Sequence, residues 1–310
     1  MSEADHEGLP ELSVVLVTYN SAHVVGAALD GLGTDPSIEI VVVDNGSSDE
    51  TVQLVRQAHP HVLVVESGGN LGFAKGVNLG VERSRGSFVM LLNPDAIISS
   101  TSVTLLLDAA RRDPDSVFAP FIEQPAPQRI LSAGWMPTTW RMLTHYSGLS
   151  RLGRSAQWAQ GHYLLPDQVT KPTNVEWATG ACLLFSRAVW VRLGGLSERW
   201  FMYAEDVEFC FRARRSGHDI WLLPEARAEH MVGASDGHRD GTVNSAWVLN
   251  LREFHASSLA HGRASTQRWT AVVAAGLASR AVLAALLKGP RSESARRFAA
   301  YSTALVRSRR

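Results

Sequence analysis

Short apolar runs rich in valine alternate with amphipathic stretches along the first third of the chain. Runs of this length and composition are typical of strands that are buried on both faces of a parallel sheet. The stretches between them have helical periodicity, and the order strand, helix, strand repeats. The pattern predicts an α/β fold with a Rossmann-like, mostly parallel sheet flanked by helices. The predicted strands are Leu12–Thr18, Ile38–Asp44, His61–Glu66 and Ser87–Leu92.

Capping residues and glycines mark where the helices between these strands begin. Ser47 and Glu50 have the spacing of a capping box, which predicts a helix over about Glu50–His59. Ser100 is expected to cap a helix that extends to Arg112. The glycine-rich loop over residues 67–78 enters a further helix, and its backbone N–H groups, together with Lys75, can approach a pyrophosphate.

Polar residues directly follow several of the apolar strands. They are Thr18-Tyr19-Asn20, Asp44-Asn45 and the turn after Val65. Residues of this kind are common in turns, but ligands of parallel α/β sheets bind beyond the carboxyl ends of the strands. Three such ends in register favour a nucleotide crevice. A further strand ends in Asn93-Pro94-Asp95 beside the same crevice, where Asp95 can hold a divalent cation through the phosphates of a substrate or serve only as a turn residue.

Two adjacent carboxylates, Glu205 and Asp206, follow a cluster of aromatic residues and open a predicted helix. A carboxylate in the first turn is stabilised as an anion by the helix dipole. Partly shielded from water by Trp200–Tyr203, Asp206 is suited to act as a general base. Acidic residues also serve simply as helix caps, and from this stretch alone that interpretation is equally good.

The middle of the chain is less regular. From Ala119 to Pro172 prolines and aromatic residues are scattered, and a stretch of this kind is usually a functional loop. Its Arg141, Arg151 and Arg154 suit a sugar or diphosphate acceptor, although each equally suits surface packing. A strand over Val175–Ser186 contains small residues that allow close approach of a ligand, and a further strand covers Ile220–Leu223.

The composition is typical of a soluble globular protein. The chain has 310 residues, 45% apolar and 19% charged, and a formal net charge of zero, so its overall charge predicts no nucleic-acid binding. Its two cysteines are far apart and in no metal-binding spacing, which excludes a disulfide framework and fits a cytoplasmic protein. Residues 1–11 are acidic and polar, which predicts a disordered lead-in and no signal peptide.

The C-terminal segment differs from the rest in charge. From Gly262 onward there are ten Lys and Arg against one Glu, a net of +9. An alanine-rich apolar run, residues 269–287, is interrupted by Arg280. A central Arg disfavours a membrane-spanning helix, so we expect this helix to lie on an anionic membrane surface. The alternative is a helical hairpin packed on the protein. We expect a main domain over residues 12–240 and a helical extension over 241–310.

Six motifs in order resemble the family 2 glycosyltransferases of the GT-A fold, over roughly residues 11–236. Within that family the chain resembles bacterial rhamnosyltransferase-like enzymes that extend polyprenyl-diphosphate-linked sugars. Their NPD, ED and H-x-x-G-x-S motifs match Asn93–Asp95, Glu205-Asp206 and His230–Ser235. The other matching segments are Val14–Asn20, Val41–Thr51, Asn70–Gly80, Trp177–Phe185 and Phe201–Arg212.

The resemblance implies a role for each matching residue. Asp206 is the general base, and Glu205, Trp177 and Tyr203 support the acceptor site. Asp95 binds Mg²⁺ or Mn²⁺ that bridges the donor's diphosphate, with His230 as a further ligand of the metal or of the diphosphate. The donor nucleotide-sugar contacts Thr18, Tyr19, Asn20, Asp44, Asn45, Gly72, Lys75, Asn93, Gly180 and Ala181.

Two departures from the family pattern affect this assignment. Asn93 stands where many relatives carry Asp, which makes the metal more dependent on the substrate. Leu196-Ser197 replaces a frequent Phe-Asp pair, which leaves the acceptor less defined.

The resemblance implies an inverting enzyme of cell-envelope glycan synthesis. It transfers a sugar, expected to be rhamnose, from a dTDP- or UDP-linked donor to a lipid-linked or polysaccharide acceptor. We expect it at the inner face of the cell membrane. Alternatives are transfer of a hexose or N-acetylhexosamine from UDP, or a nucleotide-sugar-binding protein without catalysis. The sequence leaves the oligomeric state open, a homodimer included.

Overall fold

The computed structural model describes residues 8–123, 133–152, 156–231 and 243–308. The chain divides into two compact units, and each is described by itself. The first comprises residues 1–133, 169–201 and 205–237, and the second comprises residues 134–168, 202–204 and 238–310. Residues 134–168, which the sequence analysis counted with the main domain, thus belong with the C-terminal segment.

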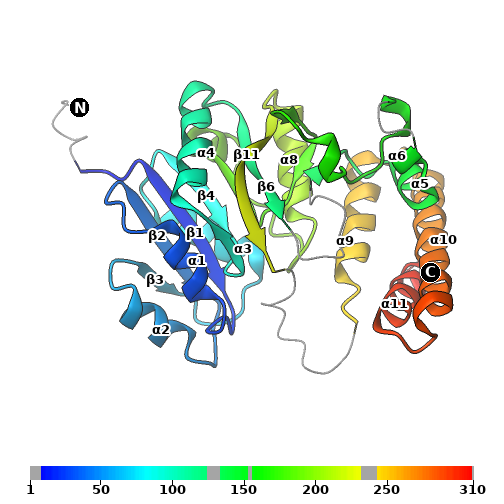
Figure 1. Ribbon diagram of the computed structural model, residues 1–310, viewed down its shortest axis with the longest axis horizontal. Coiled ribbons are helices and arrows are strands. Elements are labelled where there is room, and N and C mark those ends of the chain that lie inside the picture. Colours follow the sequence, from blue (N-terminus) through cyan, green and yellow to red (C-terminus); the bar gives the residue numbers. More distant parts are fainter. Residues whose placement is uncertain (1–7, 124–132, 153–155, 232–242, 309–310) are drawn as a thin grey trace. The chain divides into compact units, whose positions relative to one another are not determined.

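A large sheet forms the centre of the first unit (Figure 1). Four of its strands are parallel, in the spatial order β3-β2-β1-β4, and beyond β4 the sheet is mixed, in the order β10-β6-β11-β5 with β8 beside β11. The strands are β1 (Leu12–Thr18), β2 (Ile38–Asp44), β3 (Leu63–Glu66), β4 (Phe88–Leu92), β5 (Ala96–Ile98), β6 (Val117–Glu123), β8 (Thr173–Asn174), β10 (Cys182–Ser186) and β11 (Ile220–His230). Two short strands, β7 (Ala133–Gly134) and β9 (Trp177–Ala178), lie outside it.

Helices cover both faces of this sheet. Successive side chains of a strand point to opposite faces, so β1 packs Val14 and Leu16 with the residues of α1 (Val25–Leu32) and α4 (Ser100–Arg112). On the other face, α3 (Phe73–Arg83) packs on β1 and β2. Phe185 of β10 contacts Trp190 of α7 (Arg187–Leu193) and Phe209 of α8 (Glu205–Arg215). Helix α2 (Thr51–Ala58) packs beside β3 and α1.

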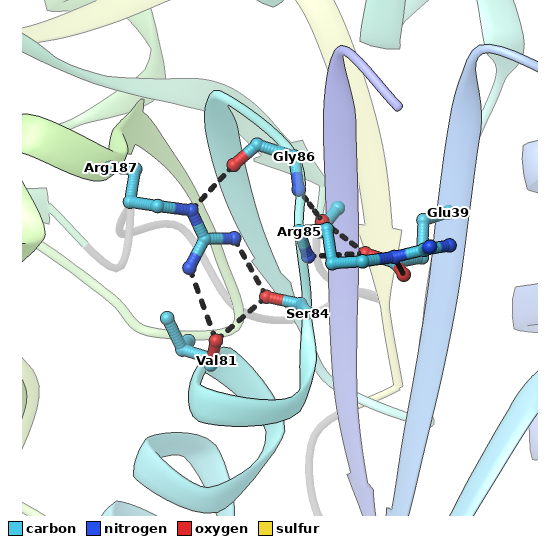
Figure 2. Close-up of polar contacts among 7 residues, drawn as sticks. Glu39, Val81, Ser84, Arg85, Gly86 and Arg187 are labelled. Carbon is cyan, nitrogen blue, oxygen red and sulfur yellow. Dashed lines mark hydrogen bonds and ion pairs between the residues drawn. The ribbon is translucent and has the colours of Figure 1, made fainter. Parts of the chain in front are cut away.

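A single arginine holds the end of α3 (Figure 2). Arg187 donates from Nη1 to the carbonyl of Val81 at 3.1 Å, from Nη2 to Ser84 Oγ at 2.9 Å and from Nε to the carbonyl of Gly86 at 2.6 Å. A cation there also complements the negative end of the helix dipole. Burial lowers the pKa of Arg187, and the charge of Glu39 opposes that effect. This contact fixes α3, whose opposite end begins at the glycine-rich loop.

The four strands predicted in the first third of the chain are confirmed to within two residues. The helices expected over about Glu50–His59 and up to Arg112 are also confirmed, but the predictions of which residues cap them are wrong. The residue before α2 is Glu50, which makes no side-chain cap. Ser47 lies too far before Thr51 to cap the helix, and its hydroxyl oxygen accepts from the amide of Asn20 instead. The residue that caps α4 is Ser99, whose hydroxyl accepts from the amide of Ser102. The strand expected over Val175–Ser186 is broken at residues 179–181, and the one expected at Ile220–Leu223 extends to His230.

The second unit is helical. Its helices are α5 (Thr139–Ser147), α6 (Leu149–Leu152), α9 (Ala246–Phe254), α10 (Arg263–Lys288) and α11 (Glu293–Arg307), with a π-helical turn over His255–Leu259. Thus the stretch expected to be irregular contains α5 and α6. Helix α10 packs against α5 and α11 (Figure 1). Trp269 of α10 is fully buried, stacks on His255 and donates from Nε1 to the carbonyl of Pro137 at 2.7 Å.

Among the described residues, α10 is long and apolar enough to cross a membrane by length and composition. Its two halves differ in burial. The buried residues of the first half include Trp269, Val273 and Leu277. The last two turns instead expose Val282, Leu283, Leu286 and Leu287, by 55–78%. All the buried residues of α10 lie between Thr266 and Leu277, so only its first half packs into the protein.

Candidate functional site

The carboxyl ends of β1 and β2 lie side by side in the first unit, since Thr18 pairs with Asp44. Thr18 Oγ1 donates to Asp44 Oδ1 at 3.0 Å. The same carboxylate accepts from the amides of Gly46 at 3.1 Å and Ser47 at 2.9 Å, and from the Ser47 hydroxyl at 2.5 Å. Asp44 is only 3% exposed, so these bonds hold it and the following loop in one geometry.

The loop after β1 is tied to the same cluster. Asn20 has a left-handed backbone, with φ of 52°, which asparagine tolerates better than most residues. Its amide donates to Ser47 Oγ at 2.9 Å, and its Oδ1 accepts from the amide of Ser48 at 2.8 Å. The neighbouring Tyr19 is 42% exposed. A flat, exposed ring beside fixed acceptors is suited to stack on a ligand's base.

Asn45 connects this cluster to the glycine-rich loop. Its Nδ2 donates to the carbonyl of Gly72 at 3.0 Å, while its buried Oδ1 accepts no hydrogen bond from the described residues. Gly72 has φ of +85°, and a Cβ there would stand 2.3 Å from the carbonyl oxygen of Phe201. That oxygen accepts from the amide of Phe73 at 2.9 Å. Only glycine fits at position 72. Lys75, a turn further along α3, is exposed.

Asp206 lies in the first turn of α8. Its Oδ2 accepts from the amide of Gly180 at 3.1 Å, and its Oδ1 accepts from the amide of Val207 at 2.8 Å. Burial raises the pKa of Asp206, and these hydrogen bonds oppose the effect without cancelling it. At Gly180 a Cβ would lie 3.4 Å from Asp206 Cβ and 3.4 Å from the Phe73 ring. The glycine-rich loop and the carboxylate are therefore neighbours.

Asp95 and His230 form a second pair. Strand β5 pairs with β11 so that Ala96 is opposite His230. His230 Nε2 lies 3.0 Å from Asp95 Oδ1 and 3.4 Å from Asn93 Nδ2, and the amide of Met231 donates to the carbonyl of Asp95 at 3.1 Å. Asp95 is only 2% exposed. The facing oxygen and nitrogen form a position that a proton or a cation can bridge.

The two carboxylates belong to one edge of the sheet. The amide of Asn93 donates to the carbonyl of Ala181 at 2.9 Å, and Ala181 follows Gly180, which binds Asp206. The site therefore contains most of the residues that the sequence predicted. They are Thr18, Asn20, Asp44, Asn45 and Gly72 on one side, and Asn93, Asp95, Gly180, Ala181, Asp206 and His230 on the other.

A divalent cation fits this site with help from a substrate. Asp95 and His230 offer one carboxylate and one imidazole at the same point. No group of three His, Cys, Asp or Glu that could hold a metal ion occurs among the described residues. Mg²⁺ is usually held by one or two carboxylates with phosphates and water, and this donor set matches that mode.

The remaining predicted residues are placed differently. Trp177 is 4% exposed and packs inside the first unit, and Glu205 is 5% exposed. Tyr203 belongs to the second unit and has a left-handed backbone, with φ of 71°. Gly233 and Ser235 of the H-x-x-G-x-S motif, and Arg154, lie outside the described residues.

Sequence reasoning missed two residues of the site. The ring of Phe73 packs beside Gly180. Asn78 binds the backbone of Leu196 in both directions, donating to its carbonyl at 3.0 Å and accepting from its amide at 2.9 Å. These residues are 118 positions apart, so no local pattern could have indicated the contact.

Known proteins resemble this chain in sequence and in fold. The N-acetylglucosaminyl-diphospho-decaprenol L-rhamnosyltransferase of Mycobacterium tuberculosis is 29% identical over 275 residues, covering 84% of this chain and 88% of the relative. The low-salt glycan biosynthesis hexosyltransferase of Haloferax volcanii is 30% identical over 232 residues, covering 72% of this chain and 67% of the relative.

Solved structures show the same fold at lower identity. A mannosyltransferase from Pyrobaculum calidifontis, in complex with GDP-Man and Mn²⁺, superposes with a TM-score of 0.61 at 17% identity, covering 97% of this chain and 87% of that one. TarS of S. aureus superposes with a TM-score of 0.52 at 14% identity, covering 96% and 92%. The GT-A fold with C-terminal helices is thus confirmed.

The family itself is decided by sequence. The model of glycosyl transferase family 2 matches residues 13–189, which is more than half of the chain and includes the ends of β1, β2 and β4 described above. Since the family model covers this much of the sequence, the chain is a glycosyltransferase of family 2.

Proposed function

We propose that this enzyme transfers rhamnose, with inversion, from a nucleotide-diphosphate sugar to a hydroxyl of a lipid-linked acceptor in cell-envelope glycan synthesis. The Mycobacterium tuberculosis relative, by its name, acts on an N-acetylglucosaminyl-diphospho-decaprenol and transfers L-rhamnose, and it aligns over most of this chain. The observation that carries the chemistry is the position of Asp206 beside Gly180, at the sheet edge that also contains Asp95.

Asp206 acts as the general base. The amides of Gly180 and Val207 and the hydroxyl of Thr179 hydrogen-bond its carboxylate and hold it in place for an acceptor hydroxyl. The ionised carboxylate removes the hydroxyl proton as that oxygen attacks the anomeric carbon, and the nucleoside diphosphate leaves from the opposite face. The bond to the leaving oxygen breaks as the new glycosidic bond forms. General-base assistance of this kind contributes about 10²–10⁴-fold.

The donor's nucleoside lies at the ends of β1 and β2. Thr18 and Asp44 are buried and hold the loops in place. These loops direct Asn20, the exposed Tyr19 ring and the unfilled Oδ1 of Asn45 to the base and ribose. Gly72 and Lys75 lie toward the diphosphate, and Gly180 and Ala181 lie toward the sugar. This order follows the sheet edge from β2 through β1 to β4 and β10.

Asp95 and His230 hold the cation, Mg²⁺ or Mn²⁺. When bound there, the ion neutralises charge that develops on the leaving diphosphate. Asp95 supplies the carboxylate and His230 the imidazole, and the substrate completes the coordination. The imidazole favours Mn²⁺ over Mg²⁺, since Mg²⁺ is a hard cation that prefers oxygen ligands. The mannosyltransferase of the same fold was solved with Mn²⁺.

The second unit associates with the inner face of the cell membrane and does not cross it. The end of α10 exposes four large apolar side chains, and exposed Lys288, Arg291, Arg296 and Arg297 follow. Apolar insertion and attraction of basic residues to anionic lipid act together in such helices.

Vesicle flotation tests whether the protein binds the membrane surface in this way. Binding to anionic vesicles should fall steeply with salt, since charges are screened over about 8 Å at physiological ionic strength. Failure to float at low salt contradicts the proposal.

Release of nucleoside diphosphate tests the reaction. The purified enzyme is offered dTDP-rhamnose, UDP-hexoses, UDP-N-acetylhexosamines and GDP-mannose, each with a polyprenyl-diphosphate-linked sugar and Mn²⁺. We expect release of dTDP from dTDP-rhamnose, dependent on the acceptor. Preferred release of UDP or GDP contradicts the choice of rhamnose. Donor binding without release from any donor contradicts catalysis and supports a nucleotide-sugar-binding protein.

A further inference from the structure

Arg280 is a partly buried cation of the second unit that lacks a carboxylate partner. It lies on α10, and no Asp or Glu is within ion-pair distance of it in the part of the chain that the structure describes. Charged groups removed from water are normally paired with an opposite charge. Burial lowers the pKa of Arg280, and the nearby positive charge of Arg151 lowers it further. The position therefore favours an anion that the protein does not itself provide.

The protein fixes Arg280 but uses little of its hydrogen-bonding capacity. Nη2 donates to His145 Nε2 at 3.0 Å, and the guanidinium stacks at 4.5 Å over the ring of Tyr146. That ring occupies the space where a Cβ of Gly276, one turn earlier on α10, would stand 2.2 Å from it. Arg has five N–H donors, and the described protein bonds employ one of them. Tyr146 contacts the face of the guanidinium and His145 accepts from one of its N–H groups. The other N–H donors remain for a ligand.

His145 contributes no compensating charge. It accepts from Arg280 with Nε2, which an imidazole can do only when that nitrogen carries no proton. Burial lowers the pKa of His145 well below its ordinary value, and the charge of Arg280 lowers it further. A neutral His145 orients the guanidinium without neutralising it.

Arg280 also lies at a boundary between buried and exposed apolar surface. Residues three and four apart share a helix face, so Val273, Gly276, Arg280, Leu283 and Leu287 follow one another along α10. The first two are buried, whereas Leu283 is 55% and Leu287 is 74% exposed. An anionic group at Arg280 thus adjoins an open apolar stripe. That combination matches an amphiphile with a phosphate headgroup and a hydrocarbon chain.

We propose that Arg280, with Arg151 nearby, binds the diphosphate of a polyprenyl-linked acceptor, whose hydrocarbon chain lies along Leu283 and Leu287. Arginine recognises phosphate oxygens through paired N–H donors, better than a point charge does. This inference rests on the lipid-linked acceptor of the proposed function and gives it a binding site.

The test measures binding of the full-length protein to neutral phosphatidylcholine vesicles doped with an undecaprenyl diphosphate. Vesicles with phosphatidylglycerol at equal surface charge, and inorganic diphosphate in solution, are the other arms. The variants are Arg280→Gln, which removes the positive charge, and Arg280→Lys, which keeps the charge but lacks the paired N–H donors of the guanidinium. Arg268→Gln, an exposed basic residue of the same helix, is the matched control. Circular dichroism and the thermal midpoint verify that each variant is folded.

We expect Arg280→Gln to weaken binding to the diphosphate vesicles tenfold or more, Arg280→Lys by less, and Arg268→Gln by less than twofold. Binding to phosphatidylglycerol should change equally in the Arg280→Gln and Arg268→Gln variants. If Arg280→Gln binds the diphosphate vesicles like the parent, or loses both kinds of vesicle equally, the site is refuted. Binding of inorganic diphosphate as tight as that of the vesicles refutes the role of the leucines.

No sugar transfer is needed for this measurement, so it separates the two proposals. Vesicle binding that depends on Arg280 in an enzyme that transfers no sugar upholds the lipid site and overturns the proposed function. Transfer to a polyprenyl-diphosphate-linked sugar at the parent's rate and KM in a folded Arg280→Gln variant upholds the function and overturns the site.

Discussion

Replacing Gly72 by Ala tests how the glycine-rich loop supports the site. The added Cβ would stand 2.3 Å from the Phe201 carbonyl oxygen, so this oxygen must retreat by about 0.7 Å to reach the 3.0 Å limit of real contacts. That movement breaks the bond that the Phe73 amide donates to it, at a cost of about 1–3 kcal/mol. Gly72 has φ of 85° and ψ of 174°, a backbone region that essentially only glycine populates, so an alanine there adds about 1–3 kcal/mol.

Gly68 of the same loop provides a matched control. Its φ is +79°, close to that of Gly72, but nothing lies within 4 Å of a Cβ built there. Gly68→Ala therefore carries the backbone cost alone, about 1–3 kcal/mol, while Gly72→Ala carries about 2–6 kcal/mol. Urea denaturation measures both. Because Phe73 packs beside Gly180 and Asp206, Gly72→Ala should also lower kcat, whereas Gly68→Ala should not. Equal stability and equal kcat in the two variants would refute the close approach of Phe201 to the loop.

Three further outcomes are expected. Because burial raises the pKa of Asp206 and a base must be ionised, kcat/KM should fall, as pH is lowered, at a pH above the ordinary Asp pKa of about 3.9. A pH–rate profile that is flat down to pH of about 4 contradicts this. Asp95→Ala should weaken donor binding in calorimetry when Mn²⁺ is present and leave it unchanged in chelator, and equal weakening in both conditions argues against a metal ligand. Arg187→Met should lower the free energy of unfolding by about 2–4 kcal/mol, since it removes three hydrogen bonds at the end of α3, and leave the KM for donor unchanged. Unchanged stability would mean that α3 does not need this contact.

The sheet and the strand-end residues were predictable because their signals are local. An apolar run such as Ile38–Asp44 can be buried only as a strand with both faces covered, and the parallel order brings Thr18 beside Asp44. The positions of these residues at the ends of parallel strands were therefore enough to predict that they lie together. The pairing of Asp95 with His230, 135 residues apart, followed only from the family resemblance, since a lone His carries no signal of its partner.

Other features could not be read from local patterns. Ser47 and Glu50 satisfy the spacing of a capping box, but the helix begins only at Thr51, and the Ser47 hydroxyl oxygen accepts from the amide of Asn20 in the loop after β1. The pattern could not distinguish these two uses of one serine. Arg280 appeared in the sequence as an interruption of an apolar helix. Its contacts with His145 and Tyr146 come from α5, about 135 residues earlier, and only the tertiary structure reveals that the helix is packed there.

The central claim is that Asp206 is the base of an inverting transfer. The most direct measurement compares the parent enzyme with Asp206→Asn for donor affinity by calorimetry and for single-turnover transfer to the acceptor, with the anomeric configuration of the product read by NMR. We expect inverted product from the parent, and in the variant similar donor affinity with transfer slowed by about 10²-fold or more. Retained configuration, or transfer by the variant at more than a tenth of the parent rate, would contradict the account.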